Sequence, residues 1–332
     1  MSLRSLHYAV ARIKVLETKL LNMERLNRMI ESESADGAFK ALLDSGYGIS
    51  SGVQDPKDFE HMISNELDAM RELIMSITPD ERLTGVFLLH YDYQNAKAFL
   101  KMRMSSRDVP DAVSGAGTID INELKEMVYQ HDTVGLPDHL AQAMAQAEKQ
   151  IEAEPDPRVV DMIMDRAYMD WAYHTVSESG DQYLMDYITA RIDMQNIMSF
   201  LRVRSTGAGI RVLKNALFEN GSIDIDFIME TLPVSNELLP GKFSETRYGK
   251  TLQSAIDSAI SSGRTWAFEK LTDNYLMNMA RQMKDEVFTI APLIGYIIAK
   301  ENEAQAVRMV MTAKLNDISQ EAIRERLREI YV

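Results

Sequence analysis

Apolar side chains recur at steps of three or four residues along most of this chain. No segment alternates apolar and polar residues as a strand would, so the pattern predicts an all-α fold. The opening segment is typical, with one face made of Leu6, Val10, Ile13, Leu16, Leu20 and Met23. Helices are predicted over residues 4–30, 58–75, 78–104, 138–152, 158–176, 181–204 and 250–286, from 292 onward, and over 319–331.

Capping residues and glycines mark where these helices begin and end. Thr78, followed by a proline and two acids, begins the first long helix. Asp120, with a glutamate three residues later, forms a capping box for a short helix. Gly-Ala-Gly interrupts the helical pattern at 115–117 and again at 207–209, and two prolines make residues 233–241 a predicted linker.

One stretch of the chain occurs twice. Residues 193–204 repeat residues 92–103 after 101 positions without a gap, and six of the twelve positions are identical. Unrelated segments would share about one position in twelve. A fainter third copy is expected at 300–308. An Asp-Ile pair opens a short amphipathic helix after each copy, at 120–121, 224–225 and 317–318.

The repeat predicts three similar helical modules arranged around an axis. Its period near 100 residues is longer than the roughly 33 to 50 residues of the common solenoids. We expect residues 1–135 to hold the N-terminal helices and the first module, residues 136–238 the second module, and residues 239–332 the third.

Composition excludes several classes of function. The chain has 332 residues, of which 45% are hydrophobic and 26% charged, as in a folded globular protein. Its net charge of -14 argues against nucleic acid or an anionic membrane as a direct partner, although a basic protein would fit. The lack of cysteine excludes disulfide scaffolds and thiolate zinc sites.

The chain shows no segment of its own for entering a membrane. Its longest nearly apolar run, residues 291–299, is about half as long as a membrane span. Charged residues interrupt any apolar core near the start, so we expect no signal peptide. We therefore expect any membrane association to go through another protein.

No motif passes the tests for a reactive site, so we predict no catalytic, cofactor-binding or metal-ligating residue. Residues 48–52 match a nucleophile elbow around Ser50, but a helix precedes them where that motif needs a strand. The two Gly-x-Gly pairs lack the third glycine of a dinucleotide loop. Residues 117–123 imitate the end of a calcium loop whose earlier ligands are missing.

The most distinctive polar residues are the pairs Asp92/Asn95 and Asp193/Asn196. A spacing of three places both members of a pair on one helix face. They could form a binding surface, or they could tie long helices to neighbouring loops. We favour the structural role because the pair occurs twice in one chain.

Five segments, spread over nearly the whole chain, together carry a family resemblance. They are residues 7–14, 42–48, 92–97, 296–303 and 318–327, and their order and spacing are more specific than any one of them. Ser45-Gly46 departs from the threonine-containing turn that the family would show. Together the segments resemble the C subunit of archaeal and bacterial V-type (A/V-type) ATPases, the relative of the d subunit of eukaryotic V-ATPases.

The resemblance implies a funnel of three similar modules about a pseudo-threefold axis. It also implies a non-catalytic central-stalk (rotor) subunit that transmits torque during rotary ion transport, without a cofactor. The implied partners are the central-shaft subunits D and F and the membrane proteolipid ring, and the implied place is the cytoplasmic face of the membrane. The alternatives are a helical scaffold for other protein partners and an all-α hydrolase that uses Ser50.

Overall fold

The described part of the chain consists of helices and loops. The computed structural model describes residues 5–332 apart from 106, 108, 110–112 and 154. No strand occurs among these residues, which confirms the all-α fold. The α-helices are α1 (Leu6–Glu17), α2 (Met23–Glu31), α3 (Ala35–Asp44), α4 (Phe59–Ile77), α5 (Glu81–Ser105), α6 (Ile121–Gln130), α7 (Asp138–Ala153), α8 (Pro157–Ser179), α9 (Gln182–Thr206), α10 (Ile210–Ala216), α11 (Ile225–Glu230), α12 (Leu239–Phe243), α13 (Gly249–Ser262), α14 (Thr265–Met283), α15 (Ala291–Leu315) and α16 (Gln320–Arg326), and the 3-10 turns are η1 (Ile49–Ser51) and η2 (Pro56–Asp58).

Two predicted helices are each divided in two, for local reasons. The helix predicted over 4–30 is α1 followed by α2, because the side chain of Asn22 accepts a hydrogen bond from Arg25 N and begins α2. The helix predicted over 250–286 is α13 followed by α14, because Gly263, at φ 64°, ends α13 in the left-handed conformation.

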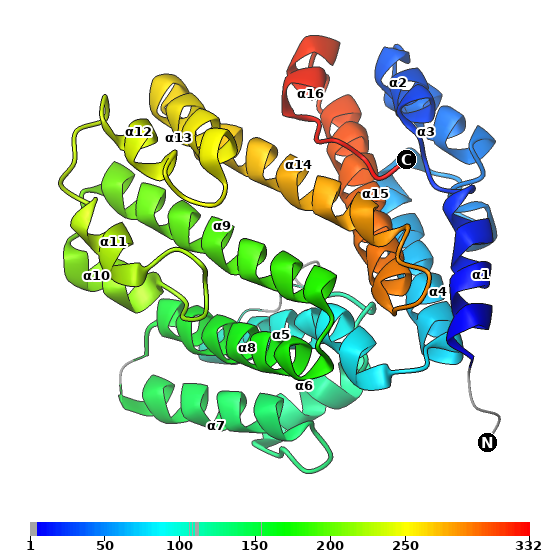
Figure 1. Cartoon of the computed structure of the whole chain (residues 1–332). Helices are drawn as coiled ribbons and strands as arrows, with labels where there is room; N and C mark the ends of the chain where they lie inside the picture. The colour runs from blue at the N-terminus through cyan, green and yellow to red at the C-terminus, as the bar shows by residue number, and fades with distance from the viewer. Residues whose placement is uncertain (1–4, 106, 108, 110–112, 154) are drawn as a thin grey trace.

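Three helices of 25 residues, α5, α9 and α15, are the longest in the described chain. Each packs along another long helix: α5 along α8, α9 along α14, and α15 along α4. Helices α5 and α15 also contact each other. In Figure 1 the C-terminal ends of α9 and α15 point away from each other, toward different sides of the molecule.

The hydrophobic core has a larger and a smaller part. The smaller part lies between the second half of α9 and helices α10–α14. Its largest fully buried side chains are Phe200, Phe243 and Phe268. The linker predicted at 233–241 runs into α12, and Leu239 is also fully buried. Only the end of this segment is packed into the core, since residues 235–238 are exposed.

The chain ends in a buried segment that is not helical. A helix was predicted up to Tyr331, but α16 ends at Arg326. Leu327, Ile330 and Tyr331 are nevertheless buried, as the apolar stripe predicted. The Tyr331 hydroxyl donates to Glu17 Oε1 on α1 at 2.8 Å, so the last residues fasten the two ends of the chain together.

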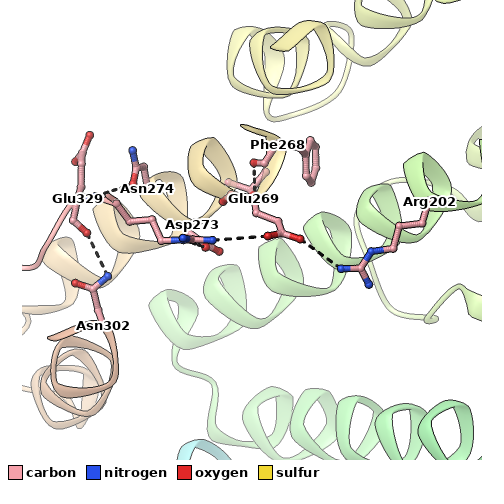
Figure 2. Close-up of polar contacts among 9 residues, drawn as sticks. Arg202, Phe268, Glu269, Asp273, Asn274, Asn302 and Glu329 are labelled. Atoms are coloured by element: carbon pink, nitrogen blue, oxygen red, sulfur yellow. Dashed lines mark hydrogen bonds and ion pairs between the residues drawn. The ribbon is translucent and has the colours of Figure 1, made fainter. Parts of the chain in front are cut away.

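A row of polar contacts runs from α9 across α14 to this terminal segment (Figure 2). Glu269 on α14 lies 3.3 Å from Arg202 on α9 and 3.7 Å from Arg328 in the terminal segment. Asn274 accepts a hydrogen bond from the backbone of Glu329 at 2.8 Å. The row therefore joins α9, α14 and the terminal segment.

Candidate functional site

The segments that imitate catalytic motifs have structural roles. Gly48 and Gly52, at φ 68° and 69°, flank a single 3-10 turn, and Ser50 lies exposed within it. A nucleophile elbow needs a strand before the serine, and none is present there. Among the described residues, no group of three or more His, Asp or Glu side chains could hold a metal ion. In the same residues, no helix combines the length and apolar character needed to cross a membrane.

Asp92 and Asn95 attach α5 to the loop before α6. The Asp92 carboxylate accepts hydrogen bonds from Thr118 N at 2.8 Å, Thr118 Oγ1 at 2.9 Å and Ile119 N at 3.0 Å. Asn95 donates to Ser114 O at 2.7 Å and accepts from Ser114 N at 2.8 Å. Asp92 is 0% and Asn95 1% exposed. They satisfy backbone groups of a loop, so the structural role favoured from the sequence is correct.

Asp193 and Asn196 make the same attachment between α9 and the loop before α11. Asp193 accepts from Ser222 N at 3.0 Å, from Ser222 Oγ at 2.7 Å and from Ile223 N at 3.0 Å. Asn196 donates to Phe218 O at 2.9 Å and accepts from Phe218 N at 2.7 Å. The two sequence copies are therefore also two copies of one hydrogen-bonded arrangement.

Glycine is required where each loop passes the buried acid. A Cβ atom on Gly117 would lie 2.2 Å from Asp92 Oδ1, and one on Gly221 would lie 2.4 Å from Asp193 Oδ1. The second glycine of the first Gly-x-Gly pair thus allows the backbone to approach a carboxylate of the same chain closely.

A third attachment exists, but its partner is the N-terminal part of the chain. Glu303 on α15 is 5% exposed, and its Oε1 accepts a hydrogen bond from Leu21 N at 2.6 Å. Leu21 immediately precedes Asn22, the residue that caps α2. In the first two copies, the last loop residue that bonds the acid likewise precedes the cap of α6 or α11.

The expected third copy was therefore aligned wrongly. The alignment at 300–308 placed Glu303 opposite Asn95, whereas its hydrogen bond makes it the counterpart of Asp92. The Asp317-Ile318 pair was expected to open the equivalent short helix. Instead, Ser319 caps α16, and Asp317 lies in the turn before it at φ 53°.

A spacing of eleven residues could have revealed the correct alignment from the sequence. Each acid is followed eleven positions later by a base, and each base donates to a backbone carbonyl near the end of the short helix. These bonds run from Arg103 to Val128 O, from Arg204 to Leu232 O at 2.5 Å, and from Lys314 to Ser32 O at 2.6 Å. Acid and base together tie each long helix to both ends of a short one.

The residue two positions before each acid comes close to its two counterparts on the other long helices. These residues are His90 on α5, Arg191 on α9 and Glu301 on α15. His90 Nε2 lies 3.5 Å from Glu301 Oε1, and the charge of Arg191 acts on both groups. Arg191 also donates to the Tyr168 hydroxyl at 3.4 Å. These three equivalent positions therefore gather at one place between the helices.

Burial controls the protonation of this group. Burial, assisted by the charge of Arg191, lowers the pKa of His90 to about 3, so the imidazole is neutral at pH 7. Burial raises the pKa of Glu301 to about 7, although Arg191 and a hydrogen bond with Tyr91 act to lower it. The carboxylate is therefore only partly ionised near neutral pH and balances Arg191 incompletely.

A polar cavity of about 210 Å³ lies beside this group. Its lining includes Gln94 and Lys97 from α5, Asp165 from α8, and Arg191 and Gln195 from α9. Lys97 and Asp165 neutralise each other at 2.5 Å. Arg191 makes no ion pair within 4.0 Å with any described residue. The cavity thus contains one positive charge without a directly bonded carboxylate.

Comparison with known proteins agrees with the resemblance found in the sequence. The C subunit of the V-type sodium ATPase of Enterococcus hirae is 24% identical over 330 residues, which cover 96% of this chain and 97% of that protein. The C subunit of the A-type ATP synthase of Methanocaldococcus jannaschii is 22% identical over 340 residues, with 96% and 85% covered. The family described as ATP synthase (C/AC39) subunit matches residues 9–326, a range that contains all three acid attachments. The chain therefore belongs to the ATP synthase (C/AC39) subunit family, and both relatives named above are C subunits of A-type or V-type ATPases.

Proposed function

We propose that this chain is a non-catalytic rotor subunit that couples the central shaft, made of subunits D and F, to the membrane proteolipid ring. Its family supports membership of the rotary complex. The observation that carries the coupling role is the threefold repetition of one helix attachment around a common meeting point of α5, α9 and α15. A funnel that seats a shaft needs such an arrangement about an axis.

The equivalent contacts support three four-helix units around a pseudo-threefold axis. One unit would be α5–α8, the second α9 with α11, α13 and α14, and the third α15 with α2, α3 and α4. In each, the long helix packs along the last helix and holds the short helix by an acid and a base. This partition replaces the boundaries expected at 135 and 238, because the N-terminal helices complete the third unit.

Such a closed ring of units suits a part that transmits torque. The buried Lys300 pairs with Glu66, 234 positions away, at 2.8 Å, and also with Glu303 at 2.6 Å. Arg308 pairs with Glu60 on α4 at 2.8 Å. Sliding of α15 against α4 would break these pairs, and breaking a buried pair leaves an uncompensated charge at a cost of several kcal/mol. The third unit would therefore keep its shape under load.

The recurring polar residues and glycines have structural roles, which supports the proposal that the subunit catalyses no reaction itself. The glycines, aspartates and asparagines that recur along the chain hold helices to loops. An acidic surface also suits attachment to the membrane ring through protein contacts, at the cytoplasmic face, rather than to anionic lipid directly.

Co-purification separates this role from that of a scaffold for unrelated partners. The chain would be tagged in its own cell and isolated from detergent-solubilised membranes. We expect the proteolipid ring and subunits D and F to accompany it in fixed proportion. Isolation with other proteins, and without ring or shaft subunits, would refute the proposed coupling role.

A further inference from the structure

The cavity beside Arg191 has the features of a site for a single negative charge. It lies between α5, α8 and α9, next to the point where the three long helices meet. Two of its three basic groups are already accounted for, since Lys97 pairs with Asp165 and His90 is neutral at pH 7. The remaining group is the Arg191 guanidinium, whose planar fork suits a carboxylate.

Arg191 is incompletely satisfied by the chain itself. Its hydrogen bond to the neutral Tyr168 hydroxyl is long, at 3.4 Å, and the guanidinium stacks over that ring at 5.6 Å. A guanidinium group offers five N–H donors. No Arg191 nitrogen is among the buried atoms of the described residues that lack a partner, so its unbonded donors are accessible from the cavity that Arg191 lines. A carboxylate that enters the cavity could accept hydrogen bonds from these donors.

Two glutamines flank the cavity at equivalent positions. Gln94 and Gln195 each follow an anchoring acid by two residues, and both are exposed although the helices around them are largely buried. Both line the cavity. Gln305 follows Glu303 by two residues and is exposed as well, but it is not part of the lining. The three glutamines therefore share the same spacing from an anchoring acid and are all exposed, but only Gln94 and Gln195 border the cavity.

We propose that this cavity receives a carboxylate of the central shaft, with Arg191 as the main donor and the side-chain amides of Gln94 and Gln195 beside it. This inference rests on the proposed coupling function. One positive charge favours a singly charged carboxylate over a doubly charged phosphate, because a second negative charge would be desolvated without a partner. The cavity lies beside the point where side chains of α5, α9 and α15 meet, which is where the proposed coupling function would seat the shaft, so we take the shaft as the source.

The test measures the affinity of purified shaft complex D–F for the full chain at pH 7. Gln94→Glu and Gln195→Glu place a like charge at the cavity and should each weaken binding by roughly tenfold or more. Gln305→Glu is the matched control, with the same substitution at the equivalent exposed position, and should change binding by less than about twofold. Arg191→Lys keeps the charge but loses the fork and should weaken binding by a similar tenfold, with unfolding of each variant measured in parallel.

The outcomes separate this inference from the function on which it rests. If Gln94→Glu and Gln195→Glu bind the shaft as Gln305→Glu does, or if all three weaken binding equally, the site is refuted. If the wild-type chain does not bind the shaft at all, the coupling function fails instead. Sodium acetate titrated against the Arg191 Nε–H signal by NMR then tests the cavity alone. A shift lost in Gln195→Glu would support a carboxylate site open to free anions, and no shift would refute it.

Discussion

Replacing Gly117 with alanine should detach α5 from the loop before α6. The new Cβ would lie 2.2 Å from Asp92 Oδ1 and 2.9 Å from Asp92 Cγ, whereas ordinary contacts begin at 3.4 Å. The loop or the carboxylate must therefore move by roughly 1 Å. That movement would lengthen or break the hydrogen bonds that Thr118 and Ile119 donate to Asp92.

The expected loss follows from these bonds. A hydrogen bond to a charged group contributes about 1.5 to 3 kcal/mol, and leaving a buried donor unsatisfied costs a similar amount. The three bonds share one carboxylate and will not add, so we expect Gly117→Ala to lower the free energy of unfolding by about 2 to 4 kcal/mol. Urea unfolding of the full chain, followed by circular dichroism, measures this directly.

Gly209 provides the control because it occupies the same place in the other Gly-Ala-Gly segment. No atom lies within 4 Å of the position that a Cβ would take there, and its φ is −81°. Gly209 is the N-cap of α10, where glycine is preferred over alanine, so Gly209→Ala should lower stability by no more than about 1 kcal/mol. Equal urea midpoints for Gly117→Ala and Gly209→Ala would refute the argument from close approach.

Three further predictions concern protonation, the terminal segment and nucleotides. Burial raises the pKa of Glu301 from 4.5 to about 7, so the native state loses stability as pH rises through this range. Glu301→Gln should therefore be more stable than wild type at pH 8, by at most about 3 kcal/mol, but not at pH 4.5. A stability advantage of Glu301→Gln that is the same at both pH values in urea titrations would contradict this. Leu327→Ala should lower the free energy of unfolding by about 2 to 5 kcal/mol because the side chain is buried, whereas Arg326→Ala, at an exposed position, should lower it far less. Matching unfolding midpoints for Leu327→Ala and wild type would show that the segment is not packed. Calorimetry should find no saturable ATP binding to the isolated chain, and a dissociation constant of about 1 μM would overturn its assignment as a non-catalytic part.

The helices could be predicted from the sequence because their signal is local. Apolar steps of three and four residues depend only on which face is buried, so most helices and the capping role of Asp120 follow directly. The end of the chain shows the limit of this signal. Leu327 and Ile330 are spaced as on a helix, yet they are buried in a non-helical segment that lies against other elements.

The attachments were predictable only where both partners are near in sequence. Asp92 bonds a loop 26 positions away, and its repetition at Asp193 made the structural role evident. Glu303 bonds Leu21, 282 positions away, and no local pattern connects them. The cavity at Arg191 likewise depends on three helices meeting, which spacing along one helix cannot show.

ATP-driven ion transport in membrane vesicles, with and without this chain, tests the proposed coupling role most directly. Vesicles prepared from cells that lack the chain should retain ATP hydrolysis by the catalytic head but lose ATP-driven transport. Adding the purified chain should restore transport in proportion to the amount that rebinds. Full transport in its absence would contradict the role of this chain as the connection between shaft and ring.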